Sequence, residues 1–243
     1  IGAAKMAQDV GTESQKDYLR RFGLLNSASI ELPEIGIPLM PALWRPINTM
    51  TISYGHGIAV SPIQLVNGVS NIVNGGFKRP ATLIKIENAV STEKRILKAD
   101  TSEKVRQLMR LVVSEGTGRK AEAPGYLLGG KTGTADKLKG RNYSKSSKIS
   151  SFVGVFPIDK PRFALLVIVD EPKGNKATFN YATGGWVAAP AVGRIVNRIA
   201  PIVGIPPNLS ENFQNLKIDK ERPRKLKQRK RNVLIKKAAW SSR

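Results

Sequence analysis

The most regular pattern of hydrophobic and polar positions lies in residues 61–76 and predicts an amphipathic helix. Ser61 can cap its start, the next residue is a proline that fits the first turn, and Gln64 completes a capping box. The apolar positions on its one face are Leu65, Val69, Ile72 and Val73. Because Gly75 and Gly76 follow directly, we expect the helix to end there.

Three other segments carry weaker helical patterns. Residues 1–10 are rich in good helix formers, and apolar residues recur at helical spacing over 105–116 and 190–199. By contrast, residues 25–57 contain four prolines and several glycines, so we expect mainly loops there.

Three runs in the second half of the chain predict β-strands, at 126–135, 150–157 and 162–170. The last two are separated by the four-residue sequence IDKP, which suits the turn of an antiparallel hairpin. Residues 81–98 alternate loosely and predict additional short strands. Helices therefore come first, then neighbouring strands, then a closing helix. This order favours an α+β fold, an antiparallel sheet with helices on its faces, over an alternating parallel sheet.

The residue types restrict the chemistry that the chain can perform. There is no cysteine and only one histidine, so disulfides, thiol nucleophiles and zinc sites of cysteine and histidine are excluded. A Ser-His-Asp triad would need His56 as its base, so we expect lysine to accept the proton in any nucleophilic catalysis. We expect no metal ion and no cofactor. No run approaches the roughly 20 apolar residues of a membrane-spanning helix.

The net charge of +22 is concentrated toward the C-terminus. Residues 217–243 hold twelve Lys and Arg against two acidic residues, a net charge of +10. Two prolines precede this stretch, so we divide the chain into a folded part, 1–207, and a basic tail, 208–243, which we expect to be disordered. The charge of the tail suits an anionic membrane surface. Because Trp240 is the only aromatic residue of 217–243, we expect no specific nucleic-acid binding.

The sequence PGYLLGGKTGTAD, residues 124–136, fits two different motifs. From Gly125 it matches the phosphate-loop pattern G-x-x-x-x-G-K-[ST], and the apolar run ending at Asp170 resembles the strand and acid that accompany such loops. A phosphate loop needs a strand before it and a helix that starts at the Lys-Thr pair. The preceding residues are polar and broken by Gly and Pro, and the following ones have no apolar helical face. Nucleotide binding is therefore a remote alternative.

From Lys131 the same sequence reads KTGT, the Lys-Thr-Gly element of penicillin-recognising serine enzymes. On a strand, Lys131 and Gly133 project to one face, and Thr132 and Thr134 to the other. Lysine and neighbouring hydroxyls can hold a substrate carboxylate. Gly133 lets a peptide pair closely with the strand, and the Thr134 N–H can stabilise an oxyanion. The alternative is an ordinary edge strand with an exposed lysine.

Several blocks of sequence in a fixed order resemble the transpeptidase domain of class B penicillin-binding proteins, above all the division-septum type. The blocks are YGHGIAVSPIQL (54–65), GGKTGTA (129–135), SFVGVFP (151–157), PRFALLVIVDEP (161–172) and GGWVAAPAVGRI (184–195). The resemblance runs from Ile1 to about Pro207. It implies a penicillin-binding/serine β-lactamase-like fold and a serine peptidoglycan D,D-transpeptidase on the periplasmic face of the bacterial inner membrane. Its ligands would be stem peptides ending in D-Ala-D-Ala and β-lactams, and division proteins would be further partners.

The resemblance also implies roles for single residues. Lys131, Thr132 and Thr134 would bind the substrate carboxylate, Gly133 would allow close approach, and the Thr134 amide would form half of an oxyanion hole. Tyr54, Gly55 and Gly57 match a Gly-x-Gly region that we interpret as structural, and we interpret His56 in the same way.

Two elements of the family are missing from their expected places. The Ser-x-x-Lys nucleophile motif has a counterpart only at Ser91–Lys94, in a polar link, and Ser-x-Asn only at Ser210–Asn212, beyond the folded part. We interpret both as accidental. In division-type relatives, sequence like IGAAKMA directly follows Ser-x-Asn. We therefore expect a C-terminal fragment that lacks the nucleophile, the membrane anchor and the N-terminal part of the domain.

Such a fragment would be inactive unless a separate polypeptide supplied the rest. Its sheet would be poorly covered, which promotes association. The alternative is a non-catalytic interaction module, or a decayed gene product, with the same fold.

Overall fold

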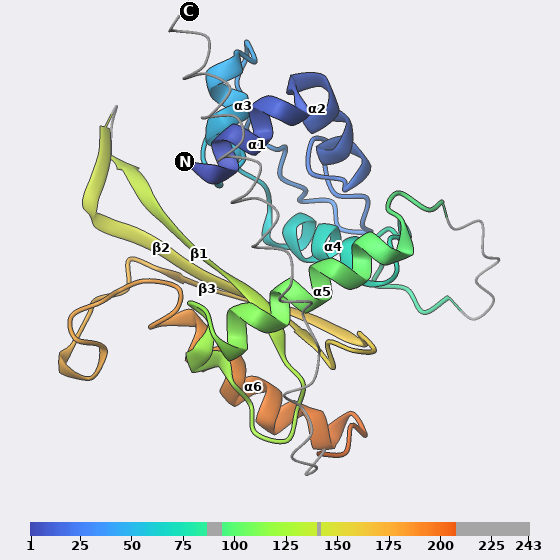
Figure 1. Cartoon of the computed structure of the whole chain (residues 1–243), viewed down its shortest axis with the longest axis vertical. Helices are drawn as coiled ribbons and strands as arrows, with labels where there is room; N and C mark the ends of the chain where they lie inside the picture. The colour runs from blue at the N-terminus through green and yellow to red at the C-terminus, as the bar shows by residue number, and fades with distance from the viewer. Residues whose placement is uncertain (87–93, 140–141, 208–243) are drawn as a thin grey trace, which may run out of the picture. The chain divides into compact units, whose positions relative to one another are not determined.

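A computed structural model of the chain describes residues 1–86, 94–139 and 142–207. Figure 1 shows the elements in order along the chain. The helices are α1 (Gly2–Val10), α2 (Thr12–Arg21), α3 (Pro46–Ile52), α4 (Pro62–Val73), α5 (Ala99–Ser114) and α6 (Ala188–Ile202). Two short 3₁₀ helices are η1 (Arg119–Ala121) and η2 (Lys176–Thr178). The strands are β1 (Gly129–Lys139), β2 (Asn142–Phe156) and β3 (Phe163–Asp170).

The three strands form one antiparallel sheet in the order β1-β2-β3. In the β1–β2 pair Gly129 lies opposite Val155, and the register shifts between Asp136 and Lys137. The sheet and its covering helices confirm the α+β fold expected from the sequence. Because β1 pairs with a strand on one side only among the described residues, its other edge is open.

Side chains of β2 alternate between two hydrophobic cores, as the two-residue period of a strand requires. Phe152 and Phe156 belong to the core that contains Val192 and Val196 of α6. Val155 belongs to a second core, together with Val73 of α4, Met109 of α5 and Ile158. Helices α4 and α5 therefore cover one face of the sheet and α6 covers the other.

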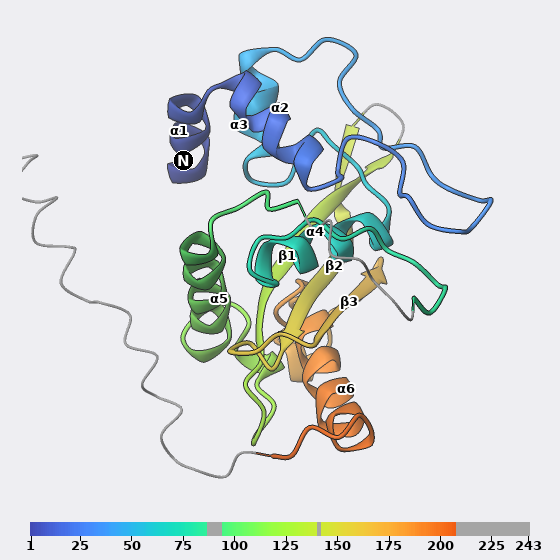
Figure 2. The ribbon, with the colours of Figure 1, turned by 90° about the vertical axis from the view of Figure 1, so that its right-hand side faces the viewer.

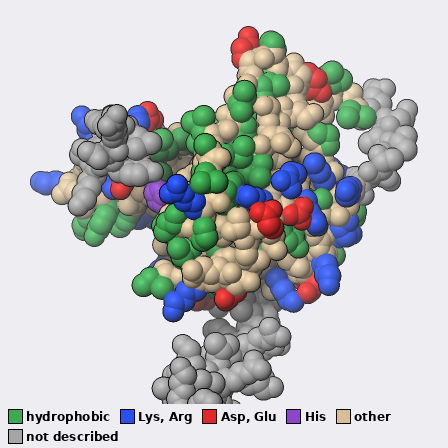
Figure 3. Space-filling model, turned by 90° about the horizontal axis from the view of Figure 1, so that it is seen from above, with side chains coloured by type: hydrophobic (Ala, Val, Ile, Leu, Met, Phe, Trp, Pro, Cys, Tyr) green, Lys and Arg blue, Asp and Glu red, His purple; other side chains and the backbone are tan. Residues whose placement is uncertain are grey.

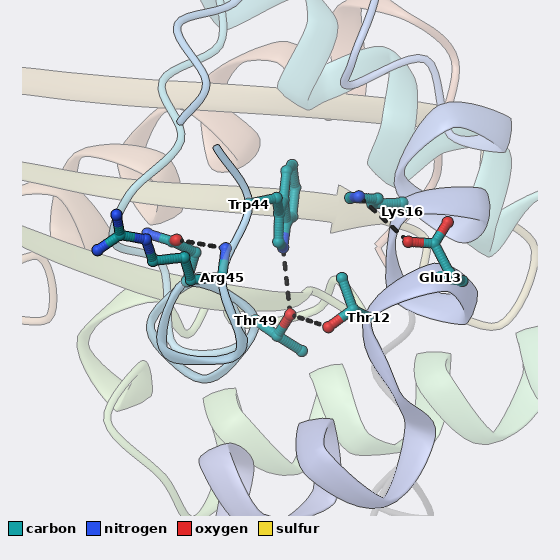
Figure 4. Close-up of polar contacts among 7 residues, drawn as sticks. Thr12, Glu13, Lys16, Trp44, Arg45 and Thr49 are labelled. Atoms are coloured by element: carbon teal, nitrogen blue, oxygen red, sulfur yellow. Dashed lines mark hydrogen bonds and ion pairs between the residues drawn. The ribbon is translucent and has the colours of Figure 1, made fainter. Parts of the chain in front are cut away.

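The three N-terminal helices form a group of their own, and Figures 1 and 2 both place this group and α6 at opposite ends of the view. A set of polar contacts around Thr49, which is 2% exposed, links α2 to α3 (Figure 4). Its hydroxyl accepts a hydrogen bond from Trp44 Nε1 at 3.1 Å and lies 2.7 Å from the Thr12 hydroxyl. The Lys16 ammonium lies 5.5 Å from the centre of a Trp44 ring, which adds a cation–π contact.

Helix α4 agrees closely with its prediction. Ser61 and Gln64 form the capping box, with the Ser61 N–H donating to Gln64 Oε1 at 3.0 Å. Gln64 is itself buried, and its side-chain amide donates to the Gly23 and Asn26 carbonyl oxygens. The cap therefore also fixes the loop that follows α2.

Other expectations need correction. Helix α2 follows the single helix expected at the N-terminus, and α3 lies within the range assigned to loops. Strand β1 begins and ends later than the predicted 126–135, and β2 begins at Asn142, well before the predicted residue 150. The described parts of 81–98 contain no strand, only an isolated bridge between Phe77 and Arg95. Ser91, Ser210 and the basic tail lie outside the described residues.

Candidate active site

The KTGT sequence lies on β1, at the open edge of the sheet. Its register confirms the predicted alternation, because Cα partners on antiparallel strands share a face. Gly133 pairs with Ser151, which has the same parity as Val155, so Lys131 and Gly133 project toward the face that α4 and α5 cover. The two threonines project toward the face of α6. A ligand along an edge strand can nevertheless reach groups on both faces.

Lys131 carries an exposed charge at this edge. Its ammonium donates to the Thr132 carbonyl oxygen at 2.8 Å, and it forms no ion pair with any described residue. The positive charge is therefore available to an incoming anion, although exposure to solvent weakens its effect.

The two threonine hydroxyls are held by loops on the α6 face. The Thr132 and Thr117 hydroxyls lie 2.9 Å apart, and Thr134 Oγ1 accepts a hydrogen bond from the Gly184 N–H at 3.1 Å. In the first pair one hydroxyl hydrogen remains free whichever group donates. Thr134 Oγ1 only accepts a hydrogen bond in its contact with the Gly184 N–H, so its O–H can still donate to a ligand.

The glycines around this edge allow unusually close packing. A Cβ on Gly133 would lie 2.4 Å from Ser151 Oγ, an atom that can move by side-chain rotation. A Cβ on Gly184 would lie 2.3 Å from the Ser151 carbonyl oxygen and 2.4 Å from that of Gly133. A Cβ on Gly185 would come similarly close to the Thr117 carbonyl oxygen. The loop before α6 can therefore reach β1 only because both residues lack side chains.

Aromatic contacts fix this same loop. The Trp186 ring stacks on Tyr181, with ring centres 5.6 Å apart, and the Lys120 ammonium lies 4.0 Å from a Trp186 ring centre. The Ser150 hydroxyl donates to the Ala182 carbonyl oxygen. The GGW block was recognised in the sequence only as part of a resemblance, and neither its contact with β1 nor that of Thr117 was predicted. The adjacent glycines were the available signal.

Further along β1, ion pairs stabilise the strand where its register shifts. The Lys137 ammonium lies 3.0 Å from Asp170 and 3.2 Å from Glu171, and hydrogen bonds to these two carboxylates raise the pKa of Lys137. Lys148 pairs with Asp136 at 2.8 Å. The Lys137 pairs link β1 to the end of β3, and the Lys148–Asp136 pair links β2 to β1.

The position of Lys131 and Thr132 also bears on the phosphate-loop alternative. Both residues lie inside a strand, and the chain continues into β2. The helix N-terminus that a phosphate loop requires is therefore not formed at the Lys-Thr pair. No group of acidic or histidine side chains within the described part of the chain is placed to hold a metal ion.

The Gly-x-Gly region has backbone conformations that explain its glycines. Gly55 and Gly57 have φ angles of 97° and 89°, in the region that favours glycine. The His56 N–H donates to the Thr51 carbonyl oxygen at 3.1 Å, and its ring lies edge-on to Tyr54. These contacts agree with a structural role for the region.

The antiparallel sheet, its covering helices and the Lys-Thr-Gly-Thr sequence on its open edge can be compared with known proteins, and the comparison identifies the family. Residues 1–197 match the family described as penicillin binding protein transpeptidase domain. The chain belongs to this family, as the sequence blocks suggested.

Several relatives are similar over most of the chain. A probable peptidoglycan D,D-transpeptidase FtsI of Caulobacter vibrioides is 40% identical over 84% of this chain and 36% of its own length. Stage V sporulation protein D of Bacillus subtilis is 35% identical, over 86% of this chain and 34% of its own length. The chain thus spans about a third of the length of these relatives.

Solved structures show the same fold. The transpeptidase domain of Burkholderia pseudomallei penicillin-binding protein 3 is 34% identical with a TM-score of 0.76, covering 86% of this chain and 63% of that one. Penicillin-binding protein 3 of Mycobacterium tuberculosis, solved in complex with ampicillin, is 27% identical with the same TM-score, covering 86% and 50%. Among the described residues, no helix has the length and apolar character needed to cross a bilayer.

Proposed function

We propose that this chain supplies the substrate-binding edge of a peptidoglycan D,D-transpeptidase. In this proposal Lys131, Thr132, Gly133 and Thr134 bind the terminal carboxylate of a stem peptide ending in D-Ala-D-Ala, and the equivalent carboxylate of a β-lactam. The observation that carries the proposal is the exposed KTGT sequence on an open strand edge, within a chain of the penicillin-binding transpeptidase family.

The chemistry follows from the geometry of the edge. An extended peptide can add to β1 through backbone hydrogen bonds, and Gly133 presents no side chain to obstruct it. The Lys131 ammonium attracts the terminal carboxylate, and the hydroxyls of Thr132 and Thr134 add hydrogen bonds to it. The Thr134 N–H would then stabilise the oxyanion that forms when the penultimate D-Ala carbonyl is attacked. In this reaction Lys131 and Thr134 are the catalytic residues that the chain contributes.

We further propose that no serine of residues 1–243 forms the acyl-enzyme. Neither Ser91 nor Ser210 has the sequence context of the family nucleophile. A complete site would then require a Ser-x-x-Lys element from outside this sequence, on the periplasmic side of the inner membrane, where peptidoglycan is cross-linked. A non-catalytic interaction module for division proteins is the second candidate, and binding of the terminal carboxylate distinguishes the two.

The test uses two N-acetylated peptides that end in D-Ala-D-Ala, one with a free carboxylate and one with a terminal amide. Saturation-transfer NMR measures the binding of each peptide to the full chain. We expect the acid to bind about tenfold more tightly than the amide, because one charge-assisted hydrogen bond contributes about 1.5–3 kcal/mol. Lys131→Gln should remove this preference.

A matched control is Lys160→Gln, which removes an exposed lysine in the turn between β2 and β3. It should leave the preference for the acid unchanged. Equal binding of the acid and the amide to the wild-type chain would overturn the proposed role of the KTGT edge and would favour the interaction module.

A further inference from the structure

A polar cleft lies between helix α4 and the turn that joins β2 to β3. Its volume is about 200 Å³, and Val155 and Ala164 line its sheet side. Pockets for drug-sized ligands occupy roughly 300–1,000 Å³, so this cleft suits one small polar group. Val155 lies four residues along β2 from Ser151, about 13 Å away. The cleft is therefore separate from the KTGT edge.

Helix α4 lines this cleft with polar side chains. They are Asn67, Ser70, Asn71 and Asn74. Residues with this spacing share one face of a helix, and a polar stripe of this kind usually faces solvent. Here the stripe lines a concave surface, and Asn71 is only 1% exposed. The arrangement is unexpected for a helix that otherwise packs against the sheet.

Two arginines lie at the cleft, and their backbones are held in place. Asn71 Oδ1 accepts a hydrogen bond from the Arg79 N–H at 2.8 Å. The Arg162 N–H donates to the Phe156 carbonyl oxygen at 3.4 Å, and its guanidinium lies 5.4 Å from the Phe163 ring centre. Because its contact with Phe163 restrains the guanidinium, the Arg162 side chain loses less entropy when a ligand binds.

The charge of the cleft is positive. Among the described residues that line it, none is acidic, and Arg162 forms no ion pair within the described ranges. Asp159 lies in the same turn but is exposed and does not line the cleft. The side chains of Asn67 and Ser70 form no hydrogen bond with another described residue, so their polar groups can serve a ligand.

We propose that this cleft binds a single oxyanion, either a carboxylate or a phosphate group. The planar guanidinium group of Arg162 matches the two oxygens of such an anion, and Asn67 and Ser70 can donate further hydrogen bonds. Anion binding in this cleft is independent of the proposed transpeptidase function, because none of the residues that line the cleft belongs to the KTGT edge.

The experiment titrates the ¹⁵N-labelled full chain with inorganic phosphate at pH 7 and constant ionic strength. We expect saturable shifts of the Ser70, Arg79 and Arg162 amides, with a dissociation constant on the order of 1 mM. Following these resonances separates the cleft from non-specific binding by the basic tail. A second titration, with acetate, distinguishes a carboxylate ligand from a phosphate ligand. Saturation by acetate indicates that the carboxylate of a peptide side chain fits, and saturation by phosphate alone indicates a phosphate ligand.

Substitutions test whether the residues of the cleft themselves bind the anion. Arg162→Gln should weaken the binding at least tenfold, whereas Arg198→Gln, at an exposed arginine of α6, should leave it unchanged. If circular dichroism shows that Arg162→Gln unfolds the chain, Asn67→Ala replaces it and should weaken binding several-fold. Linear shifts without saturation for both anions, or equal affinities in the wild type and the cleft variant, would overturn the proposal.

Discussion

At Gly184 the absence of a side chain lets three segments of the chain meet. Its N–H donates to Thr134 Oγ1, and a Cβ at this position would collide with the carbonyl oxygens of Gly133 and Ser151. One position therefore controls both the packing of the edge and the orientation of a hydroxyl in the candidate site. Gly133 differs, because the atom that opposes a Cβ there is the movable Ser151 hydroxyl.

We expect Gly184→Ala to lower the free energy of unfolding by about 2–3 kcal/mol, because its Cβ would meet backbone atoms that cannot rotate away. Urea unfolding measures the change. Gly36→Ala is the matched control, since a Cβ there meets nothing within 4 Å, and it should change the stability little. Equal stability of the Gly184 variant and the wild type would contradict this close contact and would show that the loop before α6 readily moves away from β1 and β2.

Among the helices and strands, the predictions were most accurate where a single local sequence signal was sufficient to define the element. The capping box at Ser61 and the two glycines after α4 defined that helix, and the apolar run before Asp170 defined β3. Helix α3 was missed because it has only seven residues and begins at a proline within a proline-rich segment. That Lys131 and Gly133 share one face of β1 followed from the two-residue period of a strand. By contrast, the contacts of Thr117 and Gly184 join distant segments, and no local pattern reveals them.

The link between the loops at Glu31 and Thr82 has a pH dependence that can be measured. The Thr82 hydroxyl and the Leu83 N–H donate to the Glu31 carboxylate and lower its pKa below 4.5. A lowered pKa in the folded state means that the contribution to stability is present above pH 4.5 and is lost as the pH falls through the folded-state pKa.

NMR titration should therefore give Glu31 a pKa below its ordinary value, and the hydrogen-exchange protection of the Leu83 amide, relative to an unstructured peptide at the same pH, should fall as the carboxyl becomes protonated. Glu31→Gln should accelerate this exchange at neutral pH, whereas Glu34→Gln, at an exposed carboxylate of the same loop, should not. An ordinary pKa for Glu31, or unchanged exchange in its variant, would contradict the assigned contact.

At the scale of the whole molecule, large apolar side chains remain exposed on the N-terminal helices. Met6 and Val10 of α1 are 68% and 53% exposed, and Ile47 of α3 is 54% exposed. Figure 3, a view from the end where these helices lie, shows hydrophobic side chains at the surface among Lys and Arg. Apolar groups exposed together in this way favour association between molecules.

We expect the chain to self-associate in a concentration-dependent manner, which sedimentation velocity measures. Replacing Met6 and Val10 by lysine should reduce the association, because both side chains are exposed and the charges would repel one another. The matched control, Ile202→Lys, changes an exposed residue at the end of α6 and should have little effect. Sedimentation of the wild type as a monomer at all concentrations would contradict this expectation.

We propose that this chain contains the carboxylate-binding edge of a D,D-transpeptidase site but no acylating serine. Incubation of the full chain with a fluorescent penicillin tests both parts. Fluorescence anisotropy should show reversible binding that unlabelled D-Ala-D-Ala peptide displaces and that Lys131→Gln weakens. After denaturation, the mass of the chain should be unchanged and no label should remain. A covalent adduct on a serine of residues 1–243, or binding that is independent of Lys131, would contradict the claim.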